Sequence, residues 1–130
     1  MGSSLASYPA PPGYFEIIRE ICNDYDVLFI ADEVMTALGR TGKMWGIEHW
    51  NVTPDIVALS KSLTSGYFAV AAVIARADIW NALQEANAHY VGSCTLNASV
   101  NGMVGATKTI RYIQEHNLVE KLQNPAHADQ

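Results

Sequence analysis

The chain has 130 residues, enough for one domain with a sizeable core, and 49% of them are apolar while only 16% are charged. This low charge is typical of a segment that packs within something larger. The net charge of −5 with scattered basic residues excludes a nucleic-acid surface, and no apolar run reaches the roughly 20 residues that cross a membrane.

The first half of the chain predicts a helix followed by two short strands. Residues 14–24 form an amphipathic helical pattern after Pro12 and Gly13, and residues 27–31 form a continuous apolar run. Such a run is typical of a strand covered on both faces, as in a parallel sheet. Residues 36–46 are rich in glycine and predict a loop, and residues 56–59 predict a second strand. This order indicates an α/β fold.

The second half predicts a third strand over residues 67–75 and helices over residues 77–88 and 99–114. Gly102 and Gly105 lie inside the last helix, where each costs about 1 kcal/mol relative to alanine. We therefore expect this helix to pack closely against a neighbouring element. Only two cysteines are present, Cys22 and Cys94, too few for a disulfide framework, so we expect a reducing, cytoplasmic compartment.

Two of the predicted strands end on charged residues. The first leads into Asp32 and Glu33, as does the magnesium-binding strand of a P-loop ATPase. The nearest phosphate-loop match, "ALGRTGKM", lacks the first glycine and has Met44 in place of the metal-binding hydroxyl. A P-loop ATPase is therefore only a remote alternative. The histidines show no metal-binding spacing, and we expect no metal.

Lys61 follows the second strand and has two interpretations. Its amine can simply extend to water while its apolar stem lies against the protein. Alternatively, it can form a Schiff base with pyridoxal phosphate, in which case a carboxylate is needed beside the pyridine nitrogen. Asp32 would supply that carboxylate, because open α/β sheets bind ligands at the carboxyl ends of their strands.

The stretches "FIADEVMTALGRTGK" and "PDIVALSKSLTSGY" resemble the core of class III pyridoxal-phosphate aminotransferases, the group that includes ω-amino acid and ornithine transaminases. The resemblance implies an aspartate-aminotransferase-like fold with a mixed, mostly parallel sheet and flanking helices. Residues 1–130 would form part of the large, cofactor-binding domain. The implied reaction moves an amino group from an amine or amino acid to a 2-oxo acid, and the implied assembly is a homodimer.

The resemblance also implies roles for individual residues. Lys61 matches the Schiff-base lysine, Asp32 the partner of the pyridine nitrogen, and Val34 the side chain packed on the ring. Thr95 matches the threonine that binds the cofactor phosphate of the neighbouring subunit. Glu33 is expected to anchor a loop, and Arg40 to shape one, without a catalytic role for either.

The chain departs from the family pattern near these residues. Ala37 and Ser62 stand where the pattern has glycine. The phosphate loop, the ring-stacking aromatic residue, the substrate-binding arginine and the small domain have no counterpart in the 130 residues. We therefore expect the isolated chain to bind cofactor weakly, and a non-catalytic remnant or interaction module remains the alternative function. The residues that select the substrate cannot be identified.

Overall fold

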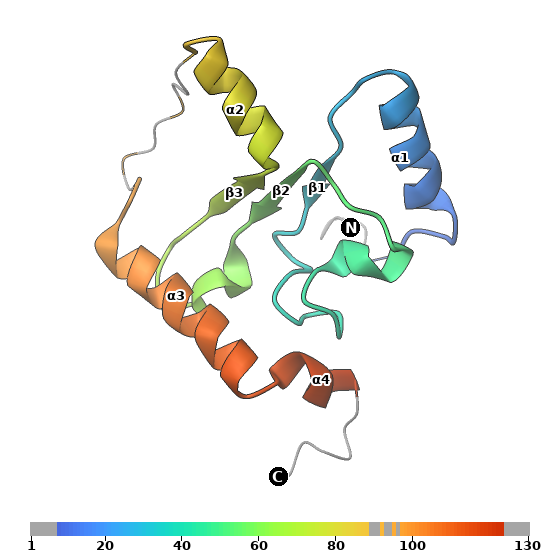
Figure 1. Ribbon diagram of the computed structural model, residues 1–130. Coiled ribbons are helices and arrows are strands. Elements are labelled where there is room, and N and C mark those ends of the chain that lie inside the picture. Colours follow the sequence, from blue (N-terminus) through green and yellow to red (C-terminus); the bar gives the residue numbers. More distant parts are fainter. Residues whose placement is uncertain (1–7, 89–91, 93–94, 96, 124–130) are drawn as a thin grey trace.

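The computed structural model describes residues 8–88, 92, 95 and 97–123, and helices surround a small sheet within it (Figure 1). The sheet contains β1 (Ile30–Asp32), β2 (Ile56–Leu59) and β3 (Ala72–Ala75), in that order. β1 and β2 run parallel, whereas β2 and β3 run antiparallel. The predicted α/β class with a mixed sheet is confirmed.

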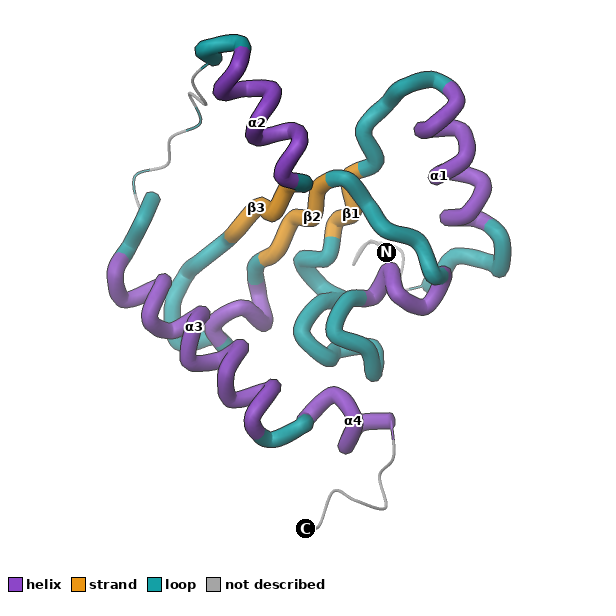
Figure 2. The backbone as a smooth tube through the Cα atoms, in the orientation of Figure 1, coloured by secondary structure: helices purple, strands orange, loops and turns teal. Residues whose placement is uncertain are grey.

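Three of the four described α-helices lie close to the predicted ranges, whereas the last one was not predicted; Figure 2 colours the helices purple and the strands orange. The described α-helices are α1 (Tyr14–Asp24), α2 (Ala77–Glu85), α3 (Val100–Glu115) and α4 (Leu118–Gln123). Two short 3-10 helices are also present. η2 (Gly46–Trp50) follows the loop over residues 36–45, and η3 (Lys61–Thr64) follows strand β2. The predictions of α1, α2 and α3 are confirmed, although α2 is three residues shorter than expected.

Two strands are shorter than the sequence predicted, because their first residues make other hydrogen bonds. The Val27 amide donates to the Cys22 carbonyl at 2.8 Å, which closes the end of α1, so β1 begins only at Ile30. The Tyr67 amide donates to the Thr64 carbonyl at 3.0 Å, and the Ser60 hydroxyl donates to the Val70 carbonyl at 2.9 Å. Residues 67–71 therefore fold around η3, and β3 begins at Ala72.

The expectation that the first strand is covered on both faces is wrong for the described part of the chain. On one face, Leu59 belongs to a buried cluster with Leu63, Ala37 and Leu38, and residues of α3 pack against that cluster. The strand register places Ile30 and Val73 on the opposite face, where they are 58% and 70% exposed. Only one face is buried because η3 and α3 lie against that face alone.

The two glycines of α3 allow the close contact that their position predicted. A Cβ atom on Gly102 would lie 2.2 Å from the Cγ2 atom of Val70, and one on Gly105 would lie 2.9 Å from the Cδ2 atom of Phe68. Real Cβ atoms essentially never approach another heavy atom so closely. Residues 66–70 can therefore pass directly over the helix at these two positions.

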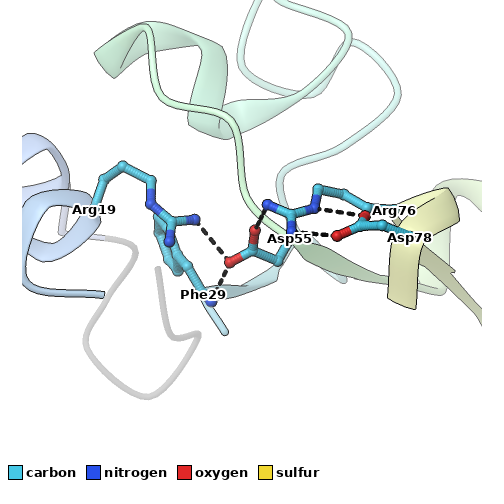
Figure 3. Close-up of polar contacts among 5 residues, drawn as sticks. All are labelled: Arg19, Phe29, Asp55, Arg76 and Asp78. Atoms are coloured by element: carbon cyan, nitrogen blue, oxygen red, sulfur yellow. Dashed lines mark hydrogen bonds and ion pairs between the residues drawn. The ribbon is translucent and has the colours of Figure 1, made fainter. Parts of the chain in front are cut away.

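A buried carboxylate joins the starting ends of β1 and β2 to the final end of β3 (Figure 3). Asp55, just before β2, has a side chain that is 2% exposed and pairs with Arg19 of α1 at 2.7 Å and with Arg76 after β3. It also accepts a hydrogen bond from the Phe29 amide, just before β1, at 2.6 Å. Burial by itself raises the pKa of Asp55, but the Arg19 and Phe29 hydrogen bonds and the two guanidinium charges outweigh burial, so its pKa lies below the ordinary value.

Candidate functional site

Asp32 and Lys61 lie at the same edge of the sheet. Asp32 is the last residue of β1 and pairs in register with Ala58, and Lys61 begins η3 two residues after β2 ends. The Glu33 amide donates to the Ala58 carbonyl at 3.0 Å, which extends the parallel pairing past Asp32. Because β1 and β2 are parallel neighbours, the two charged residues emerge from adjacent carboxyl ends, as their sequence positions predicted.

The Asp32 side chain is exposed and only partly occupied by hydrogen bonds. Its Oδ1 atom accepts a hydrogen bond from the Val34 amide at 3.0 Å, which orients the carboxylate from its own chain. No second donor reaches the Asp32 carboxylate from the residues that the structure describes. An acceptor is thus left for a protonated nitrogen of a ligand.

The Lys61 side chain is also exposed, and its amine contacts the thioether sulfur of Met35. Met35 belongs to the turn that follows Asp32, so this contact links the two strand ends directly. The amine is open to solvent. It is accessible to the carbonyl group of a ligand.

Glu33 has an environment opposite to that of Asp32, although the two are adjacent in sequence. It is 3% exposed, and its carboxylate accepts hydrogen bonds from the Gly46 amide at 2.9 Å, the Ile47 amide at 2.6 Å and the Thr36 hydroxyl. These bonds tie the loop over residues 36–45 to the end of β1. The expected loop-anchoring role of Glu33 is confirmed.

The two strand ends open into different hollows. Asp32 lines a pocket of about 230 Å³ whose walls include Phe15, Phe29 and Trp50. The Phe15 ring packs edge-on against Trp50, with the ring centres 4.8 Å apart. Lys61 lines a second pocket of about 460 Å³, on the side of the loop that carries Arg40. The two residues therefore share an edge of the sheet but not a single pocket.

Of the two remaining predicted site residues, Val34 and Thr95, the structure brings only Val34 to the sheet edge that carries Asp32 and Lys61. Val34 is half-buried and follows Asp32 by two residues, so it lies near the same edge of the sheet. Thr95 lies exposed in a turn between α2 and α3, and the described residues show no hydrogen bond from its side chain to Asp32, Val34 or Lys61. Thr95 is therefore not brought together with the other three.

Two features escaped the sequence reasoning. Asp55 was not singled out, because the two arginines that pair with it, Arg19 and Arg76, are distant in sequence. The serines at positions 62 and 65 line the Lys61 pocket, and nothing in their spacing indicated a shared site. Among the described residues, no group of His, Cys, Asp and Glu side chains is arranged to hold a metal ion, and no helix is long and apolar enough to cross a membrane.

Comparisons with known proteins agree on one family. The family model for class III aminotransferases matches residues 4–128. An uncharacterized aminotransferase, YodT of Bacillus subtilis (strain 168), is 39% identical over 121 residues, which are 93% of this chain and 27% of that protein. A transaminase structure from the marine bacterium Virgibacillus aligns with a TM-score of 0.80 and 43% identity, covering 85% of this chain and 25% of that one.

A third match includes a bound cofactor. The structure of taurine:2-oxoglutarate aminotransferase from Bifidobacterium kashiwanohense, in complex with pyridoxal phosphate and glutamate, aligns with a TM-score of 0.79 and 29% identity. The match covers 85% of this chain and 24% of that one. The chain thus spans about a quarter of the length of these relatives. It belongs to the class III aminotransferases.

Proposed function

We propose that Asp32 and Lys61 form the central part of a pyridoxal-phosphate site that moves an amino group from an amine or amino acid to a 2-oxo acid. The observation that carries the proposal is the parallel pairing of β1 and β2, which brings an exposed carboxylate and an exposed amine to one edge of the sheet. Adjacent strands lie roughly 4.8 Å apart, so one small aromatic ring can reach side chains at both strand ends.

The chemistry of the two side chains fits this cofactor, which would have to span the sheet edge between the Asp32 pocket and the Lys61 pocket. Pyridoxal phosphate supplies an aldehyde and an electron-accepting pyridine ring, which needs an amine on one side and a carboxylate at its nitrogen. The Lys61 amine is free to attack a carbonyl, and the Asp32 carboxylate keeps an open acceptor beside its hydrogen bond from Val34. Both groups are held by strand ends rather than by long loops, which favours a fixed geometry.

In this proposal each side chain has one task. The Lys61 Nζ atom would hold the carbonyl carbon of the cofactor, and as a free amine it would take up and return a proton. Asp32 would hold the ring nitrogen and favour its protonated form. Val34 would shield the ring from water.

Thr95 is proposed to bind the cofactor phosphate, and to do so across the interface of a homodimer. The test compares pyridoxal phosphate with pyridoxal, which lacks the phosphate. Thr95→Ala should weaken the binding of the phosphorylated compound and leave the binding of pyridoxal unchanged. Equal effects on the two compounds would remove Thr95 from the phosphate site.

A non-catalytic interaction module is the second candidate, and one observation favours it. Large apolar side chains are exposed on the open face of the sheet and on α1, among them Ile30, Val73 and Ile17. Apolar patches of this kind are typical of surfaces that other protein covers. Covering protein is equally compatible with a catalytic site, so cofactor chemistry at Lys61 decides between the two functions.

The proposed function is tested by trapping the cofactor with borohydride and mapping the labelled peptide. The chain has four lysines, and the proposal places the label on Lys61 rather than on Lys43, Lys108 or Lys121. Lys108→Ala serves as the matched control, because Lys108 is exposed on α3. A label spread evenly over the four lysines would show that the chain has no cofactor site.

A further inference from the structure

The pocket beside Lys61 has the chemistry of an anion site. Two cationic side chains, Arg40 and Lys61, line it together with the hydroxyl-bearing residues Ser62 and Ser65. Its other walls come from Gly66 and from the apolar Leu38 and Ile113. No carboxylate is among the described residues that line it. Positive charge and hydroxyl donors without a counter-charge favour an anionic ligand.

Arg40 is available for such a ligand. It is exposed on the loop over residues 36–45, and within residues 8–88, 92, 95 and 97–123 none of the ion pairs involves Arg40 or Lys61. The buried Glu33 carboxylate anchors the end of this loop by accepting hydrogen bonds from the amides of Gly46 and Ile47. The guanidinium thus extends from an anchored loop, and its planar fork suits two oxygen atoms of one anionic group.

Ser62 adds a hydroxyl to the pocket directly after Lys61. Ser62 is half-buried, and Ser65 is the residue that follows η3 as its C-cap. Both lie on the segment that carries Lys61, so a ligand bound by these hydroxyls is held beside the Lys61 amine.

We infer that Arg40, assisted by Ser62 and Ser65, binds an anionic oxygen group of a ligand whose carbonyl reacts with Lys61, and so selects anionic over neutral ligands. The inference rests on the proposed function, since it uses Lys61 as the reacting amine. The anionic group can be a carboxylate of a substrate or the phosphate of the cofactor. These two sources share their oxygen chemistry and are separated by the test.

The test measures how fast Lys61 reacts with matched pairs of aldehydes. Succinic semialdehyde, which carries a carboxylate, is paired with butanal, and pyridoxal phosphate is paired with pyridoxal. In each case the Lys61 amine adds to the aldehyde carbon, water leaves, and cyanoborohydride delivers a hydride that fixes the product as a secondary amine. Mass spectrometry of the Lys61 peptide then gives the rate ratio of the anionic to the neutral compound.

Arg40→Gln should lower the anionic-to-neutral ratio by about fivefold, the size expected for one exposed ion pair. The ratio of the unchanged protein should also fall when the salt concentration is raised, because salt screens exposed charges. Arg111→Gln removes the same charge from an exposed position on α3 outside the pocket and should leave the ratio unchanged. Ser62→Gly should lower the ratio less than Arg40→Gln does.

The aldehyde pair that responds identifies the anion. A fall for succinic semialdehyde alone assigns the pocket to a substrate carboxylate, and a fall for pyridoxal phosphate alone assigns it to the cofactor phosphate. If Lys61 is labelled but Arg40→Gln changes neither ratio, the anion site is wrong while the proposed function stands. If Lys61 is no more reactive than the other lysines, the proposed function itself fails. Circular dichroism of each variant, compared with that of the unchanged chain, confirms that the variant is folded.

Discussion

The Asp55 carboxylate accepts a hydrogen bond from the backbone amide of Phe29 at 2.6 Å, and it thereby ties the start of β2 to the start of β1. The Phe29 carbonyl in turn accepts the amides of Asp55 at 2.8 Å and Ile56 at 3.2 Å. These bonds lie at the opposite end of the strands from Asp32 and Lys61. They fix the register that brings the two strand ends together.

Asp55→Asn should lower the free energy of unfolding by about 1–3 kcal/mol, because Arg19 and Arg76 lose their charged partner in a buried position. Urea unfolding followed by circular dichroism measures the loss. Asp78→Asn is the matched control, since Asp78 also pairs with Arg76 but is 64% exposed, and its loss should be clearly smaller. Equal losses would show that Asp55 does not hold the strands together.

The stabilisation by Asp55 should depend on pH. The pKa of Asp55 is lower in the folded chain than its ordinary value of 3.8. As the pH falls, Asp55 is therefore protonated at a higher pH in the unfolded chain than in the folded chain. The stabilisation by the Asp55 carboxylate is complete above pH 3.8 and disappears as the pH falls through the pKa of Asp55 in the folded chain. The difference in stability between the unchanged chain and Asp55→Asn should be constant from pH 7 to about 5 and shrink below about 4. A difference that grows in acid would contradict this sign.

Asp32→Asn and Glu33→Gln should affect different properties, the first cofactor binding and the second stability. Glu33 is buried with three donors, so Glu33→Gln should lower the free energy of unfolding by about 1–3 kcal/mol. Asp32 is exposed, so Asp32→Asn should leave stability nearly unchanged and weaken the binding of pyridoxal phosphate. Thermal unfolding and cofactor titration of both variants provide the comparison. The assignment of the two carboxylates would be reversed if Asp32→Asn unfolded the chain.

Gly102→Ala should destabilise the chain even though alanine favours a helix by about 1 kcal/mol over glycine. The added methyl group would lie 2.2 Å from Val70, and overpacking of this kind costs roughly 1–3 kcal/mol. Adding Val70→Ala removes the obstructing atom and should recover part of the loss. Unfolding midpoints of the single and double variants measure the coupling, and additive losses would mean that the two positions do not touch.

The sequence predicted the local structure well where a single chain segment decides it. The helix over residues 14–24, the strand at 56–59 and the glycine-lined contact of α3 follow from periodicity and from residue size. The positions of Asp32 and Lys61 at one edge follow from the ends of two apolar runs. These features depend on short stretches whose pattern is complete in the sequence.

Other features of the structure depend on contacts between segments that are distant in sequence, which the local sequence pattern does not reveal. The hydrogen bond from the Val27 amide to the Cys22 carbonyl sets the start of β1. Which face of the sheet stays exposed depends on which elements lie against it. Asp55 owes its burial to two arginines that are 36 and 21 positions away. The cationic character of the Lys61 pocket comes from a loop and a 3-10 helix that meet only in the fold.

The protonation of the cofactor ring shows whether Asp32 and Lys61 act on one cofactor. Pyridoxal phosphate labelled with ¹⁵N in the ring is fixed to Lys61 by borohydride, and NMR then follows the pKa of the pyridine nitrogen. If both residues act on the ring, this pKa should lie roughly 1–3 pH units above that of the same adduct on a short peptide, and Asp32→Asn should abolish the difference while Lys108→Ala should not. An adduct on Lys61 with the same nitrogen pKa in the unchanged chain and in Asp32→Asn would contradict this prediction.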